Sequence, residues 1–496
     1  MIWWRNIPFF LVWTPLLFAS ITAAVKPMLA RFLILLFPAL GVVLAGVLTA
    51  KLVEAGGAFT YAMGAFGAPF GNELRAGALE ALLATAFCLI MLLSLLGGWN
   101  RMNVQIPRQR LGLYCVMVML LLSGMMAEVF TNDMFTAYVF IEIMTISACS
   151  LIVARTRGRT LFAATKYMIF NQLGSGLFLL GLAMLYCMTG HLLMGDIRLK
   201  VDALVAGGEH MDSLTLAVAL ITVGLAVKSA LFPFHSWLPD AYSGCTPASS
   251  AMLSSLISKT YIFLYIKFVV RVIGLENLDA LHLRPILLAC AIASILMGSI
   301  DAIMEKKLRR MIAYSSVAQI GYIYLGIAVG TEAGIAAAVF HMIAHALAKS
   351  LLFLTGDRLI GASDGDAHFH ELRGAAFRAP VCGAAFTVGA LSIVGVPLFA
   401  GFASKLYLCR ACLDMSNRWA VVGLMVLAVS TALNAAYFII TIVTLYRTPT
   451  HEYTTRMHHH WYSTAALAAI AVLLVLVGLL APQLYGVIQA GIGVLA

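Results

Sequence analysis

Short polar segments divide this sequence into about fourteen apolar windows, each long enough to cross a lipid bilayer. A transmembrane helix needs about 20 predominantly apolar residues. Lipid offers the backbone no hydrogen-bond partners, so such windows are expected to be helical. The windows lie at residues 8–25, 30–52, 78–97, 111–130, 134–154, 161–188, 213–232, 246–273, 285–303, 311–330, 333–355, 380–407, 419–446 and 463–490.

The composition excludes the soluble alternatives. Hydrophobic residues make up 62% of the 496-residue chain and charged residues only 11%, whereas a soluble globular protein carries about 25% charged residues. So few charges cannot cover a water-facing surface of this size. A soluble enzyme, a nucleic-acid-binding domain, a disordered chain and a disulfide-stapled secreted module are therefore excluded. The expected fold class is an all-α polytopic membrane protein.

The net charge of +10 is explained by the side of the membrane on which the loops lie. Basic residues gather in the loops after odd-numbered windows: Arg101, Arg108 and Arg110 follow the third, and Lys306 and Lys307 begin a basic run after the ninth. Because Lys and Arg retain loops on the cytoplasmic side, we expect a multi-pass protein of the inner (cytoplasmic) membrane with both termini outside. The first window is similar to a signal peptide, but its length favours an uncleaved helix.

We single out seven titratable side chains that lie inside five of the mid-chain spans. Each costs about 2.5–3.5 kcal/mol on insertion scales, so together they are expected to line a hydrated or paired interior. A single intramembrane Lys can snorkel, and a lone His can be a packing residue. A proton or cation pathway explains the whole set more simply. The seven are Glu142, Lys228, Lys259, His341, His345, Lys349 and Lys405.

The eleventh window places His341, His345 and Lys349 at four-residue intervals. On a helix they share one stripe, each about 6 Å above the last. This spacing suits a proton relay with bridging water, since imidazole binds and releases protons near neutral pH. Haem ligation by His345 would require a matching His on a facing helix, and no other window offers an obvious one. We expect no cofactor and no metal in this chain.

Two windows contain residues that interrupt helices. The seventh continues into SALFPFHSWLPDAY, with Pro233 and Pro239, and the twelfth contains LSIVGVPLFAGF, with Gly395 and Pro397. Proline removes a backbone donor and clashes with the preceding turn. Broken backbone at membrane depth is tolerated only where it is buried in protein or lines a water-filled cavity. A simple proline kink is the alternative explanation for either break alone.

The breaks at Pro233 and Pro397 lie five helices apart, which is typical of transporters built from inverted repeats. We therefore expect two inverted five-helix repeats within about 14 transmembrane helices. The predicted division is 1–110 for helices 1–3, 111–275 for the first repeat (helices 4–8), 284–446 for the second repeat (helices 9–13) and 463–490 for helix 14.

We assign no functional site to three further segments. Residues 55–77 are too Gly-rich for a regular helix and are expected to form an outer-face loop or interfacial hairpin. Cys409 and Cys412 form a CxxC pair, but without a second pair nearby they are interpreted as buried loop thiols. The run His458–His460 is interpreted as a solvated loop rather than a metal site.

At these motifs the chain resembles a known family. It is similar to the antiporter-like membrane subunits of the respiratory complex I superfamily, which includes the Mrp-type Na⁺/H⁺ antiporters and the membrane-bound hydrogenases. The resemblance covers about residues 110–410 and is closest to the Mrp D-type or hydrogenase-linked branch. The segments that carry it are TNDMFTAYVFIEIM, TKYMIFNQLGSGL, GLAVKSALFPFHSWLPDAY, KLRRMIAYSSVAQIGYI, HMIAHALAKSLLFL and ELRGAAFRAPVCGAAFTVGALSIVGVPLFAGFASK.

The resemblance implies a role for each titratable residue. Glu142 and Lys228 would form the charge pair of a first half-channel, and Lys259 would be the central relay lysine. The histidine stripe with Lys349 would continue the chain towards Lys405, the terminal residue of the second half-channel. A neighbouring redox or ion-driven event would change the Glu142–Lys228 pairing and so drive protons along the axis.

The family pattern also implies partners. These are other membrane subunits of the same complex, sister antiporter-like subunits among them, with H⁺ and in some members Na⁺ as the ion, and lipid around it. One departure from the pattern stands after WLPDA, where Tyr242 and CTPASSAML replace a His and a proline-serine-valine-serine run. This departure puts proton entry at that loop in doubt, and His235 and Asp240 are candidate substitutes.

The leading hypothesis is a proton-translocating subunit with no redox site of its own. It would serve an oxidoreductase of the NADH:quinone or hydrogenase type, or an antiporter. A stand-alone secondary transporter of a small solute is the main alternative, and it predicts a midplane pocket with substrate-sized polar groups. A third hypothesis is a redox enzyme that holds haem or quinone, but the sequence offers no dinucleotide glycine fingerprint and no iron–sulfur cysteine array.

Overall fold

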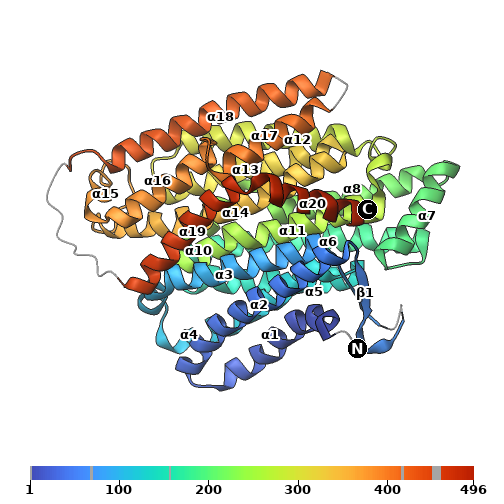
Figure 1. The fold of residues 1–496 in the computed structure, drawn as a ribbon, viewed down its shortest axis with the longest axis horizontal. Coiled ribbons are helices and arrows are strands. Elements are labelled where there is room, and N and C mark those ends of the chain that lie inside the picture. Colours follow the sequence, from blue (N-terminus) through green and yellow to red (C-terminus); the bar gives the residue numbers. More distant parts are fainter. Residues whose placement is uncertain (1–2, 68–70, 156–157, 415–417, 450–459, 496) are drawn as a thin grey trace.

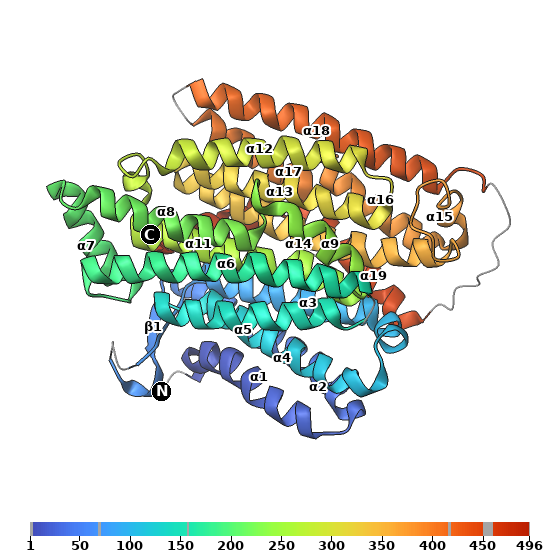
Figure 2. The same cartoon turned by 180° about the vertical axis from the view of Figure 1, so that it is seen from behind.

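A computed structural model gives the fold (Figure 1). Long helices run roughly side by side along its longest axis, and α1 (Ile7–Ala24) and α18 (Arg418–Leu445) lie at opposite edges in both views (Figures 1 and 2). The protein is therefore an all-helical polytopic membrane protein, with one small hairpin. The structure describes residues 3–67, 71–155, 158–414, 418–449 and 460–495.

The N-terminal part contains a hairpin between its second and third long helices. Strands β1 (Phe59–Ala62) and β2 (Glu73–Ala76) pair antiparallel, with Phe59 opposite Ala76. Of the two alternatives expected for residues 55–77, a loop or a hairpin, the structure shows a hairpin. The long helices here are α1, α2 (Pro27–Ala55) and α3 (Ala78–Gln105), and a 3₁₀ turn, η1 (Trp3–Asn6), precedes them.

The remaining helices follow the predicted windows closely. The middle of the chain forms α4 (Arg108–Phe130), α5 (Met134–Val153), α6 (Gly158–Thr189), α7 (Met194–Gly207), α8 (Met211–Ser229), α9 (Leu238–Gly244), α10 (Pro247–Met252) and α11 (Ser258–Lys267). The last part forms α12 (Leu283–Met304), α13 (Leu308–Val329), α14 (Glu332–Gly361), α15 (Ala375–Arg378), α16 (Pro380–Val394), α17 (Ala400–Leu413), α18, α19 (Trp461–Leu479) and α20 (Ala481–Leu495).

Twelve helical stretches of the described chain are long and apolar enough to cross a membrane, and each coincides with a predicted window. The other two windows hold interrupted helices. Window 246–273 contains α10, α11 and two π-helical turns, η4 (Leu253–Ile257) and η5 (Phe268–Ile273). Window 380–407 contains α16 and α17. The assignment of two five-helix inverted repeats to 111–275 and 284–446 stays a prediction.

Two details differ from the expected pattern. The short helix α7 lies between the sixth and seventh windows, where no helix was expected, and it sits at one end of the molecule (Figure 1). The last window, 463–490, holds two helices rather than one. They meet at Leu480, which leaves the helical conformation just before the Ala481–Pro482 step.

Both predicted breaks interrupt the helical backbone. Helix α8 ends at Ser229, and Ala230 takes a left-handed conformation with φ 61° before a 3₁₀ turn, η3 (Phe234–Trp237). Pro239 lies in the first turn of α9, where a missing N–H costs nothing, so it begins a helix rather than interrupting one. In the second half α16 ends at Val394, and α17 begins only at Ala400.

Helix α14 is the centre of the molecule. Every described side chain from Gly334 to Asp357 is buried, as expected for a helix that is apolar on all faces. Around it pack α3, α13, α16, α17, α19 and α20, together with α10 and the π-helical turn η4. The His-and-Lys stripe of this helix is therefore surrounded by protein and does not face lipid.

The two ends of the bundle differ. The chain ends, the hairpin and α7 gather at one end, and α15 lies at the other (Figure 1). The loops after α12 and α14 also meet, since Lys307 forms an isolated β-bridge with His368 and Leu308 N–H donates to the Ala367 carbonyl. Both termini thus share one end, as expected. Which end faces the outside stays a prediction.

Helices α6 and α8 approach backbone to backbone at Gly174 and Gly224. A Cβ atom on Gly224 would lie 2.6 Å from the Gly174 carbonyl oxygen and 2.9 Å from the Phe178 nitrogen. A Cβ atom on Gly174 would lie 3.2 Å from Cγ of Lys228. Glycine at these positions therefore lets α8 come close enough to bring Lys228 into the packed interior.

We expect Gly224→Ala to lower the stability of the folded protein by about 1–3 kcal/mol, because the added methyl group meets backbone atoms that cannot move aside. The control is Gly176→Ala on the exposed face of α6, where a Cβ atom meets nothing within 4 Å. Thermal unfolding of the detergent-purified protein measures both variants. Equal melting temperatures for Gly224→Ala and the control would contradict the close-packing interpretation.

Candidate functional site

Six of the seven titratable residues predicted from the sequence are buried in the structure. Lys228, Lys259, His341, His345 and Lys349 are at most 2% exposed, and Lys405 is 8% exposed. Glu142 is only half-buried, on α5. The six lie on α8, α11, α14 and α17. Their side chains therefore enter the interior from several helices rather than facing lipid.

Lys228 lies at the end of α8, next to the first break. Its Nζ atom donates to Oγ1 of Thr145 at 3.0 Å and lies 5.4 Å from the centre of the Tyr261 ring. The C-terminal end of a helix carries partial negative charge from unpaired carbonyls, which favours a cation there. Trp237 satisfies one of these carbonyls by donating to Val227 at 3.1 Å. The break thus provides a polar environment for a buried ammonium group.

Lys405 occupies a similar environment at the second break. Its Nζ atom donates to the carbonyl of Val394, the last residue of α16, at 2.9 Å, and to Oγ1 of Thr431 at 3.2 Å. It also lies 5.4 Å from the centre of the Tyr322 ring. Each half of the molecule therefore combines a helix break, a lysine, a threonine hydroxyl and a tyrosine face.

Glu142 and Lys228 do not form a direct ion pair. The ion pairs within 4.0 Å among the described residues do not include them, and Lys228 instead contacts Thr145, one turn further along α5. The charges of Glu142 and Glu128 nevertheless act on Lys228 over a longer distance. The Oε1 atom of Glu142 is buried and has no hydrogen-bond partner in the structure. Glu142 therefore affects Lys228 through its charge, without a hydrogen bond or ion pair between the two.

Lys259 lies directly after the π-helical turn η4. Its Nζ atom donates to the carbonyl of Ser254, which belongs to that turn. A π-helical turn shifts the backbone hydrogen-bond pattern, and such turns are frequent at functional sites. The charge of Lys259 acts on His341, His345 and Lys349 of α14. Lys259 is therefore close enough for its charge to act on these three groups of α14.

The two histidines of α14 stack on each other. Their ring centres lie 6.0 Å apart with an angle of 13° between the rings, which confirms the spacing expected for one helical stripe. Nδ1 of His341 is 2.9 Å from Oγ of Ser404 on α17. Nε2 of His341 and both ring nitrogens of His345 are buried without a hydrogen-bond partner in the structure. Such nitrogens are available to a proton or a water molecule.

A small cavity connects the histidines with Lys405. Its space for water is about 10 Å³, roughly what a single water molecule needs. The amide nitrogen of Gln319, another lining residue, is also buried without a partner. One water molecule here would have the polar neighbours that a buried water requires. The cavity is lined by Gln319, His341, Ala344, His345, Ser392, Ile393, Gly401 and Lys405.

Lys349 points to a different neighbour than the histidines do. Its Nζ atom donates to the Ile312 carbonyl at 2.7 Å and to Oγ of Ser315, both on α13. The stripe therefore divides: His341 bonds to α17, and Lys349 bonds to α13. Of the other residues singled out in the sequence, His235 lies 3.6 Å from Asp301, and Asp240 pairs with Lys166 and Arg310.

Two charged residues with no exposed surface were not among the site residues predicted from the sequence. Glu128 lies near the end of α4, and Lys267 is the last residue of α11; both have 0% exposure. The same criterion, a charge within an apolar window, would have found them, because they fall inside windows 111–130 and 246–273. A buried ion pair also links α13 to α14, with Nη1 of Arg309 lying 3.5 Å from Oδ1 of Asp357.

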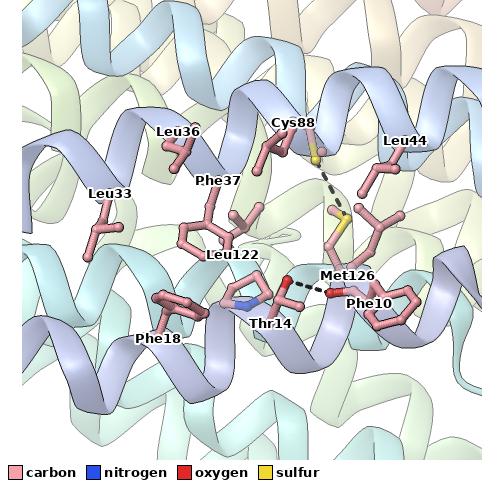
Figure 3. A pocket seen from close by; sticks show the side chains of 14 residues that line it. Phe10, Thr14, Phe18, Leu33, Leu36, Phe37, Leu44, Cys88, Leu122 and Met126 are labelled. Atoms are coloured by element: carbon pink, nitrogen blue, oxygen red, sulfur yellow. Dashed lines mark hydrogen bonds between the residues drawn. The ribbon is translucent and has the colours of Figure 1, made fainter.

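A second and more voluminous cavity lies away from these charges. It has a volume of about 390 Å³ and lies between α1, α2, α3 and α4. Figure 3 shows that apolar side chains line it, among them Phe18, Leu36 and Phe37. The one hydroxyl drawn there, that of Thr14, already donates to the Phe10 carbonyl at 2.6 Å. This cavity does not offer the substrate-sized polar groups that the small-solute alternative predicts.

The remaining sequence motifs are only partly described. Cys409 and Cys412 are free thiols on helix α17 rather than in a loop as predicted, and only Cys412 is buried, since Cys409 is half-buried. Of the run His458–His460, residues 458 and 459 lie outside the described residues.

Comparisons with known proteins place the chain among membrane transport subunits. The family model described as "NADH:quinone oxidoreductase/Mrp antiporter, TM" matches residues 131–433. NADH-quinone oxidoreductase subunit N of Desulforudis audaxviator is 35% identical over 81% of this chain and 78% of the relative. The D-type subunit of the Na⁺/H⁺ antiporter of Bacillus subtilis is 30% identical over 76% and 74%. Because both kinds of name occur, the resemblance to the Mrp D-type branch in particular stays a prediction.

The fold is also that of known complex subunits. A chain of the Mrp complex from Dietzia sp. DQ12-45-1b superposes with a TM-score of 0.87 at 22% identity, over 99% of this chain and 97% of that chain. The structural neighbours are subunits of multisubunit membrane complexes.

The Lys228–Thr145 contact leads to a stability prediction. Thr145→Val keeps the side-chain shape but removes the acceptor of Lys228, and an unsatisfied buried donor costs about 1–3 kcal/mol. We expect a lower melting temperature for Thr145→Val and recovery of most of the loss when Lys228→Met is added.

The control is Thr165→Val on α6. Its hydroxyl bonds to the carbonyl four residues earlier, as that of Thr145 does, but Thr165 is exposed. A melting temperature of Thr145→Val that matches the control would show that Lys228 gains nothing from this hydroxyl.

Proposed function

The chain belongs to the NADH:quinone oxidoreductase/Mrp antiporter family of membrane proteins, and from that premise we propose that it carries protons through its buried Glu, Lys and His side chains. It does so as a subunit of a multisubunit membrane complex, with or without exchange for Na⁺. We assign no redox step to its own residues. The electron transfer or ion gradient that drives transport belongs to partner subunits.

One observation carries the proposal: buried titratable side chains extend through both halves, and a lysine stands at each helix break. We propose the order Glu142, which is half-buried, followed by the buried residues Lys228, Lys259, His345, His341 and Lys405. Charged groups in hydrocarbon are costly and mark ion pathways and proton relays. A purely structural cluster would be expected to pair its charges, yet several of these groups keep unpartnered atoms.

The chemistry at each site is transfer of a proton between neighbouring bases. Lys259 and the α14 groups His345 and Lys349 repel one another when charged, so protonation of one favours release from another. The unpartnered nitrogens of His341 and His345, with the small cavity beside Lys405, supply a route for a proton through one water molecule. The proton thereby passes from Lys259 to the histidines and on to Lys405.

Glu142 is the point at which a partner acts. It is half-buried on α5, so a neighbouring subunit reaches it, while its charge acts on Lys228. A change in its charge or position alters how strongly Lys228 holds a proton, since an opposite charge nearby favours the charged form. No direct contact joins Lys228 and Lys259 in the described part of the chain. We propose that water beside Tyr261 bridges them, because that ring lies against Lys228.

We expect Lys228→Met and Lys405→Met each to abolish proton translocation by the native complex while leaving its assembly intact, because each removes a titratable group but keeps side-chain length. Acidification of inside-out vesicles measures pumping, and immunoblotting of the purified complex measures assembly. The matched control is Lys306→Met, which changes an exposed lysine. Normal pumping by both buried-lysine variants would refute the proposed pathway.

A second expectation concerns the histidine stripe. His345→Ala removes two ring nitrogens that have no other partner, and we expect pumping to fall about tenfold or more, since a positioned proton carrier contributes at least that much. His370→Ala, with a side chain 69% exposed, is the control. Both variants are assayed for initial pumping rate at equal protein level. Equal rates would remove His345 from the relay.

A further inference from the structure

The cavity between α1, α2, α3 and α4 has no role in the pathway proposed above. Its volume is about 390 Å³. Figure 3 shows side chains of α1 (Phe10 and Phe18) and of α2 (Leu33 and Leu36) facing one another across it. Phe10 is 47% exposed, and Leu40, another lining residue, is 45% exposed. The lining therefore reaches the outer surface of two membrane-spanning helices.

The space arises because α1 and α2 are each held against a different neighbour at the level of the cavity. A Cβ atom on Gly41 of α2 would lie 2.6 Å from Sγ of Cys88 on α3, so these two helices touch there. The Ser123 hydroxyl on α4 donates to the Val12 carbonyl of α1 at 2.8 Å. The cavity is thus closed on the inner side by α3 and α4 and is open between α1 and α2.

The dimensions of the cavity suit a single hydrocarbon chain. On α2 the lining runs from Leu33 to Leu44, which is about 16 Å at a rise of 1.5 Å per residue. This length matches one leaflet, since the hydrocarbon core of a bilayer is about 30 Å thick. A helix of that length and about 10 Å across would occupy about 1,200 Å³, roughly three times the cavity volume. An acyl chain is therefore a better occupant than a helix of a partner subunit.

The chemistry of the lining also favours hydrocarbon. Thr14 and Cys88 are the lining side chains with a hydrogen-bond donor, and both donors are engaged. The Thr14 hydroxyl donates to the Phe10 carbonyl at 2.6 Å, and the Cys88 thiol lies 3.7 Å from Sδ of Met126. A ligand with polar groups would lose its hydrogen bonds on entering. The ring of a quinone would bring two carbonyl oxygens that find no donor here.

The two walls of the cavity continue towards a basic turn. Ile21 and Leu29 lie one turn beyond Phe18 and Leu33, and they are 45% and 47% exposed. Lys26, which is exposed, lies in the turn that joins α1 to α2. The apolar surface between the two helices therefore leads from the cavity to a cationic side chain.

Further basic residues share this side of the membrane. Arg108 and Arg110 are exposed in the first turn of α4. Because α1 to α4 each cross the membrane, successive helices alternate in direction, so the start of α4 lies on the same side as the α1–α2 turn. Basic residues beside a membrane surface attract anionic lipids. The charges thus complement a lipid with an anionic head group.

We propose that the cavity binds one acyl chain of an anionic phospholipid whose phosphate lies at Lys26. The chain passes between Ile21 and Leu29 and ends between the lining side chains of α1 and α2. The second acyl chain of the lipid lies in the surrounding bilayer. The bound lipid fills the space between the two helices. This proposal does not depend on the proton pathway.

The test is phospholipid binding to the detergent-purified full-length chain, measured by native mass spectrometry with phosphatidylglycerol and phosphatidylethanolamine as probes. We expect one phosphatidylglycerol to bind more tightly than phosphatidylethanolamine. Leu36→Trp fills the cavity and should weaken binding at least tenfold, because each buried CH₂ group is worth about fourfold. Leu180→Trp is the control, since Leu180 on α6 is 54% exposed. Wild-type binding by Leu36→Trp would overturn the proposal.

Lys26→Glu tests the head-group contact separately, and it changes an exposed side chain that the packed interior does not need. We expect phosphatidylglycerol to bind about fivefold more weakly or worse, since one basic residue near an anionic surface is worth about fivefold. Binding of phosphatidylethanolamine should change less. The control is Lys306→Glu, the same charge change on another exposed lysine. If Lys26→Glu binds phosphatidylglycerol as the control does, the proposal fails, even where Leu36→Trp does not fold.

The native complex distinguishes the lipid from other occupants. A phosphatidylglycerol with a photoreactive group in its acyl chain is added to the complex and activated, and the labelled peptides are identified. We expect labelled peptides from α1 and α2, and loss of this labelling in Leu36→Trp. If a partner subunit or a quinone fills the cavity in the complex, these peptides stay unlabelled, and that result would overturn the proposal.

Discussion

A buried ammonium group is stable in this protein only where backbone carbonyls and hydroxyls replace water. Carbonyls inside an intact helix are already paired with backbone N–H groups, and among the buried lysines discussed above only Lys349 bonds to such a carbonyl, that of Ile312 in α13. The interruptions of the helices release other carbonyls: Val394 ends α16 beside Lys405, Ser254 lies in a π-helical turn beside Lys259, and α8 ends one residue after Lys228. The placement of Lys228, Lys259 and Lys405 therefore depends on the placement of the breaks.

The two halves of the molecule surround a buried lysine with the same kinds of groups. Each places a lysine beside a break, a threonine hydroxyl and the face of a tyrosine. Between them lies α14, whose histidines keep unpartnered nitrogens. Because these groups repel one another when charged, a change in the charge of one group alters how strongly the next group holds a proton. The proposed pathway uses this arrangement to carry charge across the helices, in the plane of the membrane, as well as along them.

Much of the fold followed from the sequence alone, because hydrophobic length is a local property. Twelve windows coincide with long helices, and the hairpin in residues 55–77 was expected. The turn at Leu480 and the π-helical turns beside Lys259 were not, since they depend on how neighbouring helices pack. Glu128 and Lys267 were missed even though the same criterion of a charge in an apolar window applies to them. Their significance became visible only when α4 and α11 were seen to meet.

By itself the sequence determined that the chain crosses a membrane many times, that several titratable groups lie within the crossings, and that His341 and His345 share one helical stripe. These properties depend only on residue type and helical period. Tertiary structure alone decided which atoms meet: Lys228 contacts Thr145 rather than Glu142, and Lys349 turns to α13 while His341 bonds to α17. The reason is physical, since hydrogen bonds are made over about 3 Å, and only the packing of separate helices brings groups to that distance.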